Sequence, residues 1–154
     1  MIKLKTFSYK TLLFALCVIG SACSSIEEVE KEDILNTTKL FSENYFNYNF
    51  NEASQHTTSE SKLFLKWRAS NVNEQEISAY NISKNVATLD MNRLSYEKVN
   101  DTTAIVHCVM LNSIQRDNLD SAPYISKQTN YALQLTKRNK KWLIKMEGPL
   151  QSAK

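Results

Sequence analysis

The spacing of hydrophobic residues changes along the chain, and this change predicts helices followed by strands. From 33 to about 49, apolar residues recur at helical intervals and include Ile34, Phe41, Tyr45 and Tyr48. A short helix is expected to restart with Asn51 as its N-cap, because an Asn side chain can accept a hydrogen bond from the first helical turn. A third helix is expected from about 58, with Leu63, Phe64 and Trp67 on one face. Three helices therefore precede the first predicted strand.

After Val86 the hydrophobic period shortens to two residues, which predicts strands. Turn-forming residues divide this half of the chain into antiparallel strands at about 86–99, 103–115, 124–137 and 141–149. Alternation in the last two strands assigns one set of side chains to a common inner face: Tyr131, Leu133, Leu135, Trp142, Ile144 and Met146. The sequence thus predicts an α+β fold in which N-terminal helices pack on a curved four-strand antiparallel sheet.

The strand at 103–115 is apolar on both faces, so it should be central. One face holds His107 with Ile105, Val109 and Leu111, and we assign this face to a possible pocket. The other face holds Ala104, Val106, Cys108 and Met110, which would need cover on the convex side. A long side loop or a partner protein on this sheet face would provide that cover.

The N-terminus has the composition of a bacterial signal peptide. Lys3, Lys5 and Lys10 flank a short apolar stretch, Thr11 to Ile19, and small residues follow directly. This apolar stretch is too short to remain as a spanning helix, which needs about 20 apolar residues. We therefore expect residues 1–22 to be removed.

Cys23 follows the small residues and resembles the acylated cysteine of bacterial lipoproteins. The sequence has three cysteines, of which Cys17 lies in the predicted signal peptide and Cys108 is alone in the body. With Cys108 as its one cysteine, the exported domain has no internal disulfide, so Cys23 lacks the usual structural role of a cysteine in such a domain. We expect Cys23 to carry the lipid anchor. An ordinary signal peptide with cleavage nearby is the alternative.

The residues after the cysteine bear on localisation. Ser24 and Ser25 lack the Asp that marks inner-membrane retention in many Gram-negative bacteria, which favours an outer-membrane lipoprotein on the periplasmic or cell-surface side. Residues 23–32 form an acidic tether. It resembles an export tag for the cell surface, although a solvated linker has the same composition.

Removal of 22 residues from 154 leaves 132 residues, enough for one domain at 33–150. The formal net charge of +3 includes three lysines of the signal peptide, so the mature chain is neutral. Nucleic acid is not an expected partner, although basic residues gather at 137–141 around a predicted turn at Asn139.

The order of helices and strands resembles the NTF2-like cone fold, and in particular the small cystatin-like bacterial lipoproteins of unknown function. The resemblance covers roughly 33–150. It includes the stretch 48–53 after the first helix and a last strand that begins Lys141-Trp142-Leu143-Ile144. It implies a pocket between the first helix and the concave sheet face, and often a homodimer through the sheet. In enzymes of this fold a His or a carboxylate in the pocket moves a proton.

Few residues could carry chemistry. His107 is the candidate base, although a lone His on an apolar strand is more often a packed residue. Cys108 has apolar neighbours, which raise the pKa of a thiol, so it is not an expected nucleophile. No metal site, cofactor motif or catalytic constellation is recognised. Aromatic residues, together with His107, could instead line a ligand pocket: Tyr45, Trp67, His107, Tyr131 and Trp142.

These observations favour a non-enzymatic lipoprotein that binds a partner protein or a small apolar ligand. A pocket enzyme with His107 as base is one alternative. An immunity or inhibitor protein that caps its target through the sheet is another.

Overall fold

The fold is described from a computed structural model of residues 10–83 and 86–153, with side chains described from residue 27 onward. Residues 1–9 of the predicted signal peptide, and the side chain of Cys23, lie outside this description. The chain divides into two compact units, Met1–Asp33 and Ile34–Lys154. In the first unit, residues 23–32, which were expected to form an acidic tether, are helical and belong to α1 (Lys10–Phe46). Within the described residues, no helix combines the length and apolarity needed to cross a membrane.

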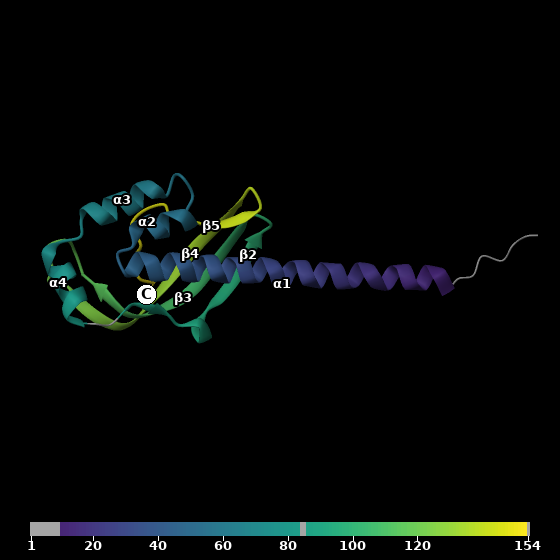
Figure 1. The fold of residues 1–154 in the computed structure, drawn as a ribbon, viewed down its shortest axis with the longest axis horizontal. Helices are drawn as coiled ribbons and strands as arrows, with labels where there is room; N and C mark the ends of the chain where they lie inside the picture. Colours follow the sequence, from purple (N-terminus) through teal and green to yellow (C-terminus); the bar gives the residue numbers. More distant parts are fainter. Residues whose placement is uncertain (1–9, 84–85, 154) are drawn as a thin grey trace, which may run out of the picture. The chain divides into compact units, whose positions relative to one another are not determined.

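The described part of the second unit contains the end of α1 and three further α-helices, which are α2 (Phe50–Ala53), α3 (Lys62–Ser70) and α4 (Glu74–Ser83) (Figure 1). A 3-10 turn, η1 (Ser54–His56), follows α2 directly. The prediction of three helices missed α4. The helix α2 also begins at Phe50, so Asn49 rather than Asn51 occupies the N-cap position. On α3 the buried residue is Leu65, whereas Leu63 is exposed, which corrects the predicted apolar face.

Five strands in the described residues form one antiparallel sheet, with β3 and β4 at its centre (Figure 1). The strands are β1 (Thr88–Leu89), β2 (Ser95–Asn100), β3 (Thr103–Gln115), β4 (Tyr124–Arg138) and β5 (Lys141–Lys145). The order is β1-β3-β4-β5, and β2 pairs with β3 beside β1. The α+β class is confirmed, and the helices on an open antiparallel sheet are consistent with an NTF2-like cone.

The first predicted strand is in fact two strands, because Asp90 interrupts it. Its carboxylate accepts hydrogen bonds from the backbone N–H of Asn92 at 3.1 Å and from Nε of Arg93 at 2.6 Å. These local hydrogen bonds stabilise a 3-10 turn, η2 (Met91–Arg93), and the turn interrupts the pairing of this segment with the neighbouring strand. The predicted four-strand sheet therefore has a fifth strand.

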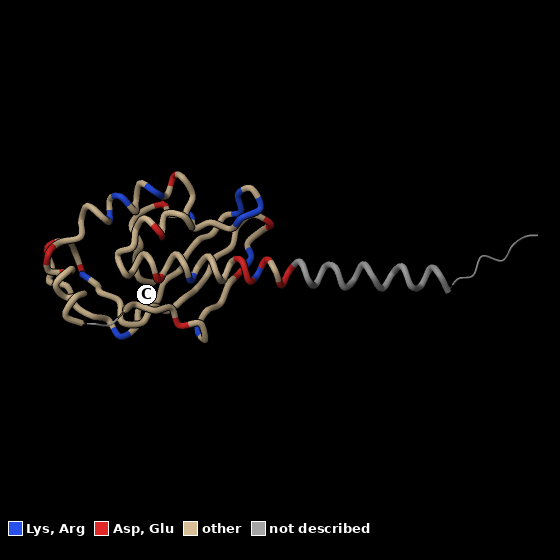
Figure 2. Tube along the Cα trace, in the orientation of Figure 1, with Lys and Arg blue, Asp and Glu red and all other residues tan. Residues whose placement is uncertain are grey.

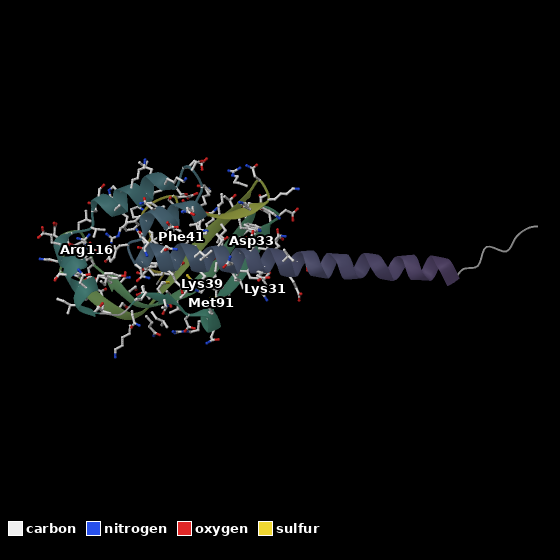
Figure 3. All side chains as sticks on the ribbon, in the orientation of Figure 1. Lys31, Asp33, Lys39, Phe41, Met91 and Arg116 are labelled. Atoms are coloured by element: carbon white, nitrogen blue, oxygen red, sulfur yellow. The ribbon has the colours of Figure 1, made fainter. Side chains whose placement is uncertain are left out.

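The core of the second unit lies between α1 and one face of the sheet. Phe41, labelled on α1 in Figure 3, is fully buried there. The inner faces predicted for β4 and β5 are confirmed, with Leu133, Trp142 and Ile144 all buried.

The two faces of β3 are opposite to the prediction. Val106 and Cys108 pair with Leu133 and Tyr131 on β4, and directly paired residues point to the same side of a sheet. The whole set of Ala104, Val106, Cys108 and Met110 is therefore buried against the helices. His107 lies exposed on the outer face. This removes the apolar set for which a side loop, a partner protein or a second copy was expected as cover.

The turn between β4 and β5 matches the prediction. Asn139 and Lys140 have positive φ values of 49° and 67°, as a two-residue hairpin loop of type I′ requires. In Figure 2 the trace at this tip is coloured for Lys and Arg, and Arg138, Lys140 and Lys141 lie there.

Candidate ligand pocket

A cavity of about 240 Å³ lies where the end of α1, the corner between α3 and α4, and the end of β3 meet. Aromatic side chains form much of its wall: Tyr45, Phe46, Tyr48, Trp67 and Tyr131. Apolar residues from the end of β3, the loop after it and the C-terminal segment complete it: Ile114, Leu119, Pro149 and Leu150. Three charged side chains also reach the wall, namely Arg68, Glu76 and Arg116.

The aromatic wall is held by the way α1 ends. Asn47 is buried, and its side-chain amide pairs with both backbone polar groups of Ala87. The next residue, Tyr48, takes a left-handed conformation with φ of 63°, which turns the chain back into α2. Tyr45 and Phe46 meet edge to face with ring centroids 5.1 Å apart, and Phe46 lies 4.8 Å from the ring of Tyr131. The rings are thus packed before any ligand enters.

Glu76 is placed by the start of α4. Its backbone N–H donates to Oδ1 of Asn73 at 2.9 Å, and its own Oε2 accepts from the backbone N–H of Asn73 at 3.3 Å. This reciprocal pair is a capping box, which fixes the first turn of a helix. The carboxylate is thereby directed inward, and its side chain is only 1% exposed.

Arg68, from α3, binds this carboxylate with two nitrogens. Its Nη2 lies 2.5 Å from Oε1 and its Nη1 lies 3.4 Å from Oε2. The guanidinium also lies 5.6 Å from the ring centroid of Tyr48, a cation–π distance, while the Tyr48 hydroxyl donates to Oε1 at 3.4 Å. Burial disfavours the charged form of Arg68, but the hydrogen bonds and charge of Glu76 outweigh this and raise its pKa.

Arg116 reaches the same carboxylate from the end of β3 and lies beside α4 (Figure 3). Its Nη2 is 3.2 Å from Oε2 of Glu76 and 2.9 Å from the backbone oxygen of Asn71. Its Nη1 donates to the backbone oxygen of Leu119 at 2.8 Å. Arg116 therefore ties α3, α4 and the loop after β3 together at the cavity.

The electrostatic balance of the cavity wall is positive. Among the described residues that line it, the acidic side chain is Glu76 and the basic ones are Arg68 and Arg116. The side chains of Arg68 and Arg116 are only 18% and 8% exposed, so water screens their charges poorly. One carboxylate shared by two guanidinium groups leaves a formal charge of +1 in a partly dry site.

The tyrosine hydroxyls of the cavity stay protonated at neutral pH. Burial together with the charge of Glu76 raises the pKa of Tyr48 to about 12. Burial also raises the pKa of Tyr45, against the charge of Arg68, and the pKa of Tyr131, whose hydroxyl bonds Oε1 of Gln115 at 3.1 Å. These groups are hydrogen-bonding partners, and the charge of the cavity comes from the arginines.

The structure brings together three of the five predicted pocket residues. Tyr45, Trp67 and Tyr131 line the cavity. His107 does not, because it points outward from the sheet, and Trp142 does not, because it is buried in the core. Neither residue therefore belongs to this cavity: His107 points to the opposite side of the sheet from the one expected, whereas Trp142 points inward as expected but packs in the core away from the cavity.

Cys108 behaves as the sequence suggested. It is a buried free thiol, and burial raises its pKa to about 12. Within the part of the chain that is described, no three His, Cys, Asp or Glu side chains are grouped so that they could hold a metal ion.

Sequence reasoning missed the three charged residues of the cavity. The pattern Asn73-x-x-Glu76 is the sequence sign of a capping box and would have placed both α4 and Glu76. No comparable pattern marks Arg68 or Arg116, because they reach Glu76 only through the tertiary fold.

A second hollow of about 470 Å³ follows α4 and the residues before it. It has the larger volume, but it is bounded by one short stretch of chain, from Val72 to Ile82, whose Ile77 and Ile82 are exposed. We therefore regard the smaller cavity, which several elements enclose, as the candidate site.

Comparison of the sequence with models of protein families and with curated proteins finds no match. The site is therefore interpreted from its own geometry.

Proposed function

We propose that this protein is a binding protein for a small molecule, which it holds in the cavity between α1, α3, α4 and the end of β3. The observation that carries the proposal is the wall itself. It combines five aromatic side chains with a few convergent polar groups from distant parts of the chain. This combination is typical of small-molecule sites.

The size of the cavity limits the ligand. At about 240 Å³ it lies just below the usual range of about 300–1,000 Å³ for ligand pockets. A compact ligand with one or two rings fits this space better than a long chain or a dinucleotide. The described residues that line the cavity include no His or Cys, so the arrangement supports binding more directly than proton transfer or nucleophilic chemistry.

The proposal includes the subcellular localisation of the protein. A signal peptide at 1–22 followed by Cys23 supports a lipid-anchored protein of the outer membrane, with the ligand-binding unit on the periplasmic or cell-surface side. The order of helices and strands supports the NTF2-like resemblance as part of the same proposal.

The test is to fill the cavity. Leu150→Trp places a larger side chain in the wall, and 2-naphthamide serves as a neutral aromatic probe whose binding is followed by NMR line broadening. We expect binding to the purified mature domain and its loss in Leu150→Trp. His107→Gln, on the outer sheet face, is the control and should bind as the unmodified domain does.

If neither 2-naphthamide nor 2-naphthoate binds, or if Leu150→Trp binds both unchanged while it is folded by circular dichroism, the cavity is not a ligand site. The second result would also place any observed binding elsewhere on the molecule.

A further inference from the structure

We infer that the ligand of this cavity is an organic anion, with a carboxylate as its charged group, and that Arg68 and Arg116 bind that group. This inference rests on the proposed function and adds the chemical class of the ligand. It comes from the charges, which an apolar ligand alone would leave unexplained.

The first argument is the unequal number of charges. Glu76 can neutralise one guanidinium group, yet Arg68 and Arg116 both lie within 3.4 Å of its oxygens. Bringing a second guanidinium group into a poorly hydrated site has a desolvation cost that a shared carboxylate offsets only in part. An incoming carboxylate would restore neutrality.

The second argument is the number of donors. A guanidinium group has five N–H donors, and Arg116 directs three of them at Asn71, Leu119 and Glu76. Arg68 directs two at Glu76 and also interacts with the hydroxyls of Tyr45 and Tyr48. Arg116 therefore retains more N–H groups for a ligand oxygen than Arg68 does, and both side chains line the cavity wall.

The third argument is the surrounding surface. The planar guanidinium fork binds carboxylate and phosphate oxygens, so the arginines alone do not distinguish these two anions. The rest of the wall favours an organic carboxylate over inorganic phosphate, because Phe46, Ile114 and Leu150 provide apolar contacts that inorganic phosphate cannot use. A carboxylate attached to an aromatic or aliphatic body matches both parts of the cavity.

The experiment compares two probes of the same shape. 2-Naphthoate carries a carboxylate, whereas 2-naphthamide carries a neutral amide on the same ring system. We expect the mature domain to bind 2-naphthoate about tenfold more tightly, the gain expected from charge-assisted hydrogen bonds, as measured by NMR titration. Inorganic phosphate at millimolar concentration should not compete.

Substitutions then assign the preference to the cavity. Arg68→Gln should remove most of the tenfold preference for 2-naphthoate over 2-naphthamide, and Arg68→Lys should keep part of it because the charge remains. Arg93→Gln is the matched control. It removes the same charge from an exposed residue outside the cavity and should leave the preference intact.

Three results would overturn the inference. Equal binding of the two probes by the unmodified domain would mean that the cavity does not select an anion, although it would still be a ligand site. Retention of the preference in Arg68→Gln would show that Arg68 does not bind the carboxylate. Competition by inorganic phosphate would mean that the site binds the anionic group without the organic part of the ligand.

The comparison of the two probes uses the unmodified domain, so its result is valid even if a variant fails to fold. Failure of both probes to bind would contradict the proposed function itself.

Discussion

At the scale of single residues, Asn47 joins the end of α1 to the start of the sheet through its side-chain hydrogen bonds. Its Nδ2 donates to the backbone oxygens of Ala87 at 2.8 Å and Glu43 at 2.7 Å, and its Oδ1 accepts from the N–H of Ala87 at 2.9 Å. One side chain thus satisfies two backbone groups just before β1 and fixes the end of α1. The aromatic wall of the cavity depends on that end.

Replacement of Asn47 by Ala should therefore destabilise the fold by about 2–4 kcal/mol, because each buried polar group left without a partner costs about 1–3 kcal/mol. Urea unfolding measures this change. Asn44→Ala is the control, since Asn44 makes one exposed bond to Leu40 and its loss should change stability by about 0.5 kcal/mol or less. Equal effects of the two substitutions would contradict the role of Asn47.

The buried thiol of Cys108 makes a prediction about pH. Burial raises its pKa in the folded state to about 12, above the ordinary value near 9. Above pH 9 the unfolded chain loses this proton while the folded chain keeps it. Stability should therefore fall as pH rises from 9 towards 12, by up to about 1.4 kcal/mol per pH unit from this group.

The measurement is urea unfolding between pH 8 and pH 10.5 for the unmodified domain and for Cys108→Ala. The variant should lose stability less steeply with pH, although its stability at pH 8 is lower because a small cavity remains. Parallel pH profiles for the two proteins would show that Cys108 is not responsible.

At the scale of elements, the β4–β5 hairpin has the right shape but an unfavourable residue. Lys140 takes φ of 67° in the loop, where a side chain costs about 1 kcal/mol relative to Gly. Lys140→Gly should therefore stabilise the domain by about 0.5–1 kcal/mol, measured as a rise in melting temperature.

Lys141→Gly is the matched control for the hairpin. Lys141 has the same side chain but belongs to β5, where Gly weakens a strand, so this variant should melt at a lower temperature. A lower melting temperature for Lys140→Gly as well would indicate that the loop has another conformation.

At the scale of the whole molecule, the proposed lipid anchor determines where in the cell the ligand-binding cavity is located. Cys23→Ser should abolish acylation, so that the protein leaves the membrane fraction. Intact mass spectrometry of the unmodified protein from its own host should show a chain that begins at Cys23 and carries lipid. Cys17→Ser, within the predicted signal peptide, should change neither result. A mature chain that begins elsewhere and carries no lipid would contradict the proposal.

The sequence by itself determined the features that depend on local spacing. Periodicity separated the helices from the strands, and alternation assigned the inner faces of β4 and β5, including Trp142. The left-handed turn at Asn139 and the high pKa of Cys108 also followed from neighbours along the chain. These inferences succeeded because each depends on a few consecutive residues.

Only the tertiary structure decided which face of β3 is inside and which charges meet. Both faces of β3 are apolar, so its pairing with β4, and not its own pattern, buries Cys108 and exposes His107. Arg68, Glu76 and Arg116 come from α3, α4 and the end of β3, and the ion pairs between them exist only after these elements pack. Periodicity describes one element at a time, whereas a site of this kind is a property of several elements together.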